Sequence, residues 1–109
     1  MSHLYTLTEN KFVSEASDTY FALIDGDIIS SMKEFYTAIS KALNFPDYFG
    51  ENLDALDEML YDLDWIENLH VLLIVRNSNL MLKDQPKEKE EIINLIKEID
   101  NPFFEVCFM

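Results

Sequence analysis

FPDYFGENLDALDEML, residues 45–60, is the stretch that decides the fold, because one helix must end and another must begin within it. Pro46 lacks a backbone N–H and prevents a preceding helix from continuing. Asn52 is a preferred N-cap residue, which predicts a helix from Asn52 to about Leu63. At 100° per residue the apolar side chains of this helix share one face, which we expect to be its core side: Leu53, Leu56, Met59, Leu60 and Leu63.

The opposite face of the same helix carries three carboxylates and an aromatic ring, here named the acidic ridge: Asp54, Asp57, Glu58 and Tyr61. Like charges four positions apart in a helix cost about 0.2–0.5 kcal/mol per pair. Asp54 gains from the positive end of the helix, whereas the carboxylates further along gain less. No lysine stands four positions away to neutralise them, so a cationic partner would relieve the repulsion. An ordinary solvated acidic face is the alternative explanation.

Three short apolar runs predict strands. Tyr20–Ile24 is closed by an Asp-Gly-Asp turn signal, and a third run occupies Phe103–Met109. Val71–Val75 reads VLLIV, a continuous apolar run that we expect to be covered on both faces of a sheet. The segment Arg76–Gln85 is polar and is expected to form a loop.

Two further helices are expected between these strands. Ser30 or Ser31 can cap a helix that runs to Asn44. Pro86 suits the first turn of a later helix, and Pro102 breaks that helix. The apolar residues of the later helix recur at helical spacing and predict its core face: Ile92, Leu95, Ile96 and Ile99.

The order strand, helix, helix, strand, helix, strand requires crossover connections. It therefore predicts an α/β fold with a small parallel sheet flanked by helices, formed by residues 20–109. Residues 1–19 form a separate N-terminal extension. Apolar and polar residues alternate weakly around Leu4–Thr8, so the extension is either an extra edge strand or a loose arm.

Charge is the strongest signal in the composition. The chain has 21 acidic and eight basic residues, and its formal net charge is −13. Nucleic acids and anionic membrane surfaces should repel such a chain. No lysine or arginine stands between Lys41 and Arg76, where eight acids fall, whereas the acids within Lys83–Lys97 are mixed with lysines. One stretch is therefore negative without local compensation.

The single cysteine, Cys107, excludes an internal disulfide and suits a reducing compartment. It stands between Val106 and Phe108, so we expect a buried apolar residue. Residues 1–11 lack the basic start and apolar core of a signal peptide, and no apolar run is long enough to span a bilayer. These features predict a cytoplasmic protein without membrane contact, and we expect it to be monomeric when free.

Residues 45–65 resemble the barstar family, inhibitors of barnase-type bacterial ribonucleases. The matching features are a proline, an aromatic residue, a glycine, the helix cap, an acidic helix start and the run after the helix: Pro46, Tyr48, Gly50, Asn52, Asp54-Ala55-Leu56, Leu60 and Asp62–Trp65. The strand at Val71–Val75, the last helix and the last strand also stand where the family places them. The resemblance extends roughly from Tyr20 to Met109.

This resemblance implies a three-stranded parallel sheet flanked by helices, with the helix at 52–63 inserted into the active site of a small basic ribonuclease. Family members present carboxylates where the substrate phosphates would lie. By position, the resemblance carries over a set of interface candidates: Tyr48, Phe49, Gly50, Asn52 and Asp54. The acidic ridge adds Asp57, Glu58 and Tyr61.

Three ridge-helix positions depart from the family pattern. Asp57 stands where the family often has tryptophan, Glu58 where its main anchoring aspartate is expected, and Met59 where cysteine is common. Glu58 can still form a bidentate pair with an arginine, although it puts affinity for the family's usual enzyme in question. Trp65 is either an aromatic anchor beside the ridge or a residue that covers the core. Glu98 on the last helix is a further candidate.

Nothing in the pattern predicts catalysis. The paired carboxylates of glycosidases flank a deep cleft, which an exposed helix face does not offer. His3 and His70 are isolated, so we expect no metal site, and His70 should lie at the edge of a strand. We expect no enzymatic activity and no cofactor. Two alternatives to the ribonuclease inhibitor stay open: an acidic adaptor for another basic protein, or an immunity protein against a neighbour's toxin, each acting through the same helix.

Overall fold

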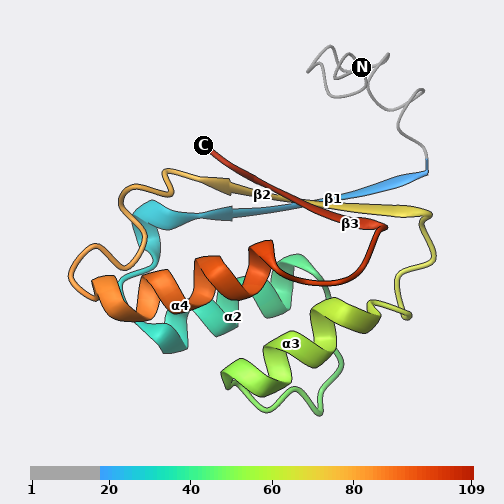
Figure 1. Cartoon of the computed structure of the whole chain (residues 1–109), viewed down its shortest axis with the longest axis horizontal. Helices are drawn as coiled ribbons and strands as arrows, with labels where there is room; N and C mark the ends of the chain where they lie inside the picture. The colour runs from blue at the N-terminus through green and yellow to red at the C-terminus, as the bar shows by residue number, and fades with distance from the viewer. Residues whose placement is uncertain (1–17) are drawn as a thin grey trace.

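The structure is a computed structural model that describes residues 18–109. Figure 1 shows two layers: a sheet, and helices that all lie on one of its faces. The elements follow one another in the order β1 (Thr19–Asp25), the 3-10 turn η2 (Gly26–Ile28), α2 (Met32–Ala42), α3 (Leu53–Asp62), β2 (His70–Arg76), α4 (Pro86–Lys97) and β3 (Phe104–Phe108).

The sheet is parallel throughout, and β2 is its central strand. Tyr20 pairs with Val71, and Val71 pairs with Phe104, so side chains of the three strands form rows across the sheet. This arrangement confirms the expected fold class. The expected extra edge strand or arm at residues 1–19 lies outside the described residues except for its last two positions, and Thr19 already belongs to β1.

Local capping explains why α2 begins at Met32. Ser31 is the N-cap, and its hydroxyl accepts a hydrogen bond of 3.1 Å from the backbone N–H of Glu34. In return the Glu34 carboxylate accepts hydrogen bonds of 2.8 Å from the backbone N–H and the hydroxyl of Ser30. These bonds favour the ionised carboxylate and lower the pKa of Glu34.

The core lies between the sheet and the helices. Alternate side chains of the strands enter it, including Ala22, Leu73 and Phe104. The described helices do not provide the expected cover on both faces of β2, because all three pack on the same face (Figure 1), yet Val71–Val75 is buried or half-buried throughout. Leu72, on the other face, is only 8% exposed, since β2 has a neighbouring strand on each side.

Two further expectations need correction. Cys107 is exposed, because strand alternation turns its neighbours toward the helices and Cys107 toward the open face. The segment between β2 and α4 is not simply a polar loop, since Met81 and Leu82 within it are fully buried. Their apolar side chains extend the core beyond the regular elements.

Candidate partner-binding site

The acidic helix α3 is fixed at both ends by its own sequence. At its start, the Asn52 Oδ1 accepts a hydrogen bond of 2.8 Å from the N–H of Ala55, and the Asn52 Nδ2 donates to the Gly50 carbonyl at 3.2 Å. At its end, Leu63 has a left-handed backbone with φ 47° and its N–H donates to the Met59 carbonyl. The expected cap at Asn52 is thereby confirmed, and its side chain is occupied in holding the helix.

The two faces of α3 divide as the periodicity predicts. Leu56 and Leu60 are fully buried, Met59 and Leu63 are nearly so, and Leu53 packs against the core from its margin. All four residues of the acidic ridge are exposed: Asp54, Asp57, Glu58 and Tyr61. The ridge therefore stands on a rigid helix whose other side is the core.

The segment before α3 separates its aromatic residues into two roles. Tyr48 is 75% exposed and free to contact a partner. Phe49 packs edge-on against Phe45 and Tyr36, with ring centroids 4.8 and 5.8 Å away, so it anchors the segment to the core. A Cβ at Gly50 would lie 3.3 Å from the Asn52 Nδ2 and would crowd the helix cap.

A groove between α3 and α4 joins residues from the middle of the described chain to residues near its C-terminal end. It has a volume of about 460 Å³, and two leucines, three carboxylates and one amide line it: Leu53, Asp57, Glu91, Asn94, Leu95 and Glu98. The structure thus brings Glu98 beside Asp57, as an extension of the ridge. Glu91 and Asn94 were missed by sequence reasoning, although their spacing to Glu98 places all three on one face of a helix.

The charge around this groove affects a nearby phenol. Tyr36 is buried, which raises the pKa of its hydroxyl because burial disfavours the phenolate. The negative charges of Glu91 and Glu51 raise it further. The groove itself is lined by three carboxylates and no basic residue, so a cation would be favoured there.

Trp65 belongs to the core side of the structure. Its indole N–H donates to the Leu43 carbonyl at 2.9 Å, and its ring meets Phe45 edge-on at 5.8 Å. It is half-buried and packs against the core. Of the two roles considered for Trp65, the structure supports the one that covers the core.

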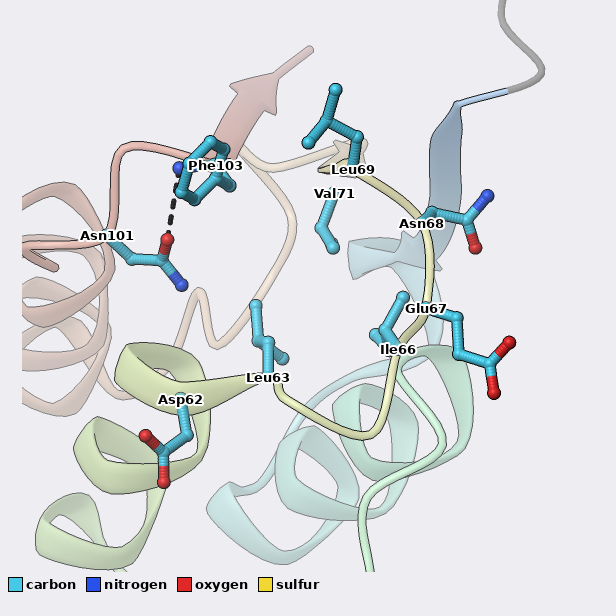
Figure 2. A pocket seen from close by; sticks show the side chains of 9 residues that line it. All are labelled: Asp62, Leu63, Ile66, Glu67, Asn68, Leu69, Val71, Asn101 and Phe103. Atoms are coloured by element: carbon cyan, nitrogen blue, oxygen red, sulfur yellow. Dashed lines mark hydrogen bonds between the residues drawn. The ribbon is translucent and has the colours of Figure 1, made fainter.

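Asn101 is a positioning residue that sequence reasoning missed. Its Nδ2 donates to the carbonyls of Leu60 and Tyr61, both at 3.1 Å, and so ties the end of α3 to the segment before β3. Its Oδ1 accepts from the N–H of Phe103 at 3.0 Å (Figure 2). These contacts hold the C-terminal half of the ridge in place.

A shallow pocket of about 290 Å³ lies next to Asn101 at the end of α3. Figure 2 shows the carboxylates of Asp62 and Glu67 at its rim. It contains no lysine or arginine, and its lining consists of Asp62, Leu63, Ile66, Glu67, Asn68, Leu69, Val71, Asn101 and Phe103.

The described part of the chain shows neither a metal site nor a membrane-spanning helix. Within residues 18–109, no group of three or more His, Cys, Asp or Glu side chains could hold a metal ion. None of the helices there is long and apolar enough to cross a membrane. His70 is the first residue of β2 and is exposed, so its expected place at a strand edge is confirmed. Its ring centroid lies 6.1 Å from that of Phe103.

The ridge, the capped segment before it and the crossover topology can be compared with known proteins. Residues 19–104 match the family model described as Barstar (barnase inhibitor). The chain belongs to the barstar family. A curated protein of Bacillus subtilis (strain 168), named "Putative ribonuclease inhibitor YrdF", is 32% identical over 79 residues, which cover 70% of this chain and 84% of that protein. The resemblance seen at residues 45–65 is thereby confirmed, and it extends over β1 to the start of β3.

Proposed function

We propose that this barstar-family protein is a non-enzymatic inhibitor of a small basic ribonuclease. The carboxylates of the acidic ridge and of the α3–α4 groove would enter the nuclease active site and lie where substrate phosphates bind. The observation that carries the proposal is a rigid helix whose exposed face bears Asp54, Asp57 and Glu58 with no basic residue on the same helix. Membership of the barstar family supports it.

The physical basis of inhibition is charge complementarity at a preorganised surface. An active site that binds RNA phosphates is positively charged, and carboxylates can form charge-assisted, bidentate pairs with its arginines. Because α3 is capped at Asn52 and tied by Asn101, little ordering entropy is lost on binding. Tyr48, in the segment before α3, and Tyr61, the aromatic member of the ridge, are both exposed and would supply apolar contact around the charges.

The test is an inhibition assay against a panel of basic barnase-type ribonucleases, including one encoded beside this gene. We expect at least one enzyme to lose its activity at a near-stoichiometric ratio of inhibitor. The association rate should fall steeply as salt rises, while dissociation changes less. If every enzyme stays fully active with excess protein, the ridge serves another basic partner, as an adaptor would. The protein itself should hydrolyse no RNA, and we expect it to act in the cytoplasm as a monomer until it binds.

A further inference from the structure

The pocket beside Asn101, here named the Asn101 pocket, begins where the acidic ridge ends (Figure 2). Asp62, the last residue of α3, follows Tyr61 of the ridge and lines the pocket. Asn101 lines it too, and its Nδ2 donates to the Tyr61 carbonyl at 3.1 Å. A partner that covers the C-terminal end of the ridge therefore also faces this pocket.

Two large apolar side chains of the Asn101 pocket are open to solvent. Leu69 is 56% exposed and Phe103 is 51% exposed, and both line the pocket. A contact that covers such groups is favourable, because it removes apolar surface from water. The volume of about 290 Å³ is slightly below the range of about 300–1,000 Å³ that is typical of small-molecule sites, so the pocket suits a single side chain.

Negative charge flanks this apolar lining without compensation. Figure 2 shows Asp62 and Glu67 on opposite sides of the pocket, and no lysine or arginine lines it. Neither carboxylate makes a hydrogen bond or ion pair within residues 18–109. The helix dipole disfavours a carboxylate in the last turn of a helix, and the last turn of α3, which ends at Asp62, has no basic residue. A cation in the pocket would offset this cost.

These features together describe an arginine side chain. The methylene stem of an arginine can lie along apolar surface while its charged end stays near water. Its guanidinium stacks on aromatic faces, such as the exposed ring of Phe103, and pairs with a carboxylate through two parallel hydrogen bonds. A lysine ammonium is a point charge that lacks this planar geometry. An acidic side chain would be repelled by both carboxylates.

We propose that the Asn101 pocket receives one arginine side chain of the nuclease from outside the nuclease active site, an inference that rests on the proposed function. The stem of the arginine would cover Leu69 and Phe103. Its guanidinium would pair with the carboxylates of Asp62 and Glu67, whose exposed side chains can turn toward it. Because the arginine lies outside the active site, the pocket selects among nucleases whose active sites accept the ridge equally well.

Dissociation rates of the inhibited complex test this assignment. Asp62→Asn combined with Glu67→Gln should speed dissociation from the nuclease by about tenfold, because the arginine loses its partners. The matched control combines Asp64→Asn with Glu105→Gln, two exposed acids that do not line the pocket, so it removes the same net charge. The control should lower the association rate and leave the dissociation rate unchanged. Circular dichroism and unfolding midpoints of both variants verify the fold.

An alanine scan of the nuclease identifies the arginine itself. Each arginine outside the nuclease active site is replaced, and each replacement is measured with the unaltered inhibitor and with the Asp62→Asn, Glu67→Gln variant. One replacement should speed dissociation of the unaltered inhibitor by about tenfold and add nothing further in the variant, since the two changes remove the same interaction.

Three results would overturn the proposal. Equal dissociation rates for the pocket variant and its control would overturn this inference alone, with the proposed function intact. The same holds if the effects of every nuclease arginine simply add to those of the pocket variant. Absence of inhibition by the unaltered protein would overturn the proposed function and this inference together.

Discussion

Helices α3 and α4 face the same groove, but α3 has four acids and no base, whereas α4 has three glutamates and three lysines. Two of the three lysines of α4 contact other parts of the fold: Lys89 donates to the Ser78 carbonyl at 2.6 Å, and the Lys97 Nζ lies 5.8 Å from the centroid of the Phe108 ring. Glu91 and Glu98 are left at the groove. Helix α3 has no basic residue at all.

This difference shows that acidic and basic residues that alternate along a sequence need not neutralise one another on the surface of the fold. Residues 83–97 read as an ordinary mixed surface, because lysines and glutamates alternate there. In the structure, two of those lysines turn toward the sheet and the loop before α4, so α4 presents carboxylates to α3. The negative surface is therefore wider than the α3 sequence indicates.

The largest expected effect is on binding at the ridge. Asp54→Ala and Glu58→Ala should each weaken inhibition by about 2–5 kcal/mol, because each leaves a cationic group of the nuclease desolvated without its partner. Their effects on stability should be small, since both side chains are exposed and Glu58→Ala relieves like-charge repulsion. Dissociation constants and unfolding midpoints of both variants provide the test. Wild-type affinity in both would show that the ridge is not the inhibitory surface.

The buried face of α3 should give the opposite profile. Leu56 is fully buried, so Leu56→Ala should lower the free energy of unfolding by about 2–5 kcal/mol through the cavity that it leaves. Binding by the fraction that remains folded should change little. Urea titration followed by an inhibition assay in the folded range separates the two effects. A loss of affinity without a loss of stability would contradict the division of α3 into two faces.

The cap of α3 should contribute less. Asn52→Ala removes the acceptor for the Ala55 N–H and should cost about 1 kcal/mol of stability. Asn52→Asp, which keeps an acceptor there, should retain most of that stability and is the matched control. Urea titration of both variants measures the effect. Equal losses in the two would mean that the hydrogen bond to Ala55 contributes nothing.

Glu58→Asp tests the departure from the family pattern at a smaller scale. The change keeps the charge and removes one methylene, so stability should stay almost unchanged. If the cognate nuclease is shaped for glutamate, the variant should bind it more weakly and bind a conventional family enzyme more tightly. Dissociation constants of the variant and of the unaltered protein with both enzymes measure these opposite changes in affinity. Parallel changes against the two enzymes would show that length at this position carries no specificity.

Sequence reasoning reached the helices, the strands and the ridge because these depend on local rules. The Asn52 cap, the 3.6-residue period of α3 and the turn after β1 each act over a few residues. The role of Asn101, the burial of Met81 and Leu82, and the exposure of Cys107 depend on which segments meet in space. The α3–α4 groove has the same origin, because Asp57 and Glu98 are brought together only by the crossover through β2.

The smallest expected effect concerns the negative charge that Glu91 contributes to the α3–α4 groove. Glu91→Gln removes a negative charge that raises the pKa of Tyr36, so that pKa should fall toward its ordinary value of 10.0 and stay above it, since burial persists. Glu90→Gln, the adjacent exposed acid that does not line the groove, is the matched control and should leave the Tyr36 pKa unchanged. Because the folded pKa is raised, the stability tied to the neutral phenol is fully present below pH 10.0 and is lost as the pH rises through the folded value. Glu91→Gln should therefore make that loss of stability slightly smaller.

NMR titration of the tyrosine rings measures the Tyr36 pKa. Association rates with the nuclease should fall modestly for Glu91→Gln and not for Glu90→Gln. If the two variants behave alike in both measurements, α4 adds nothing to the negative surface, and α3 carries the binding potential by itself.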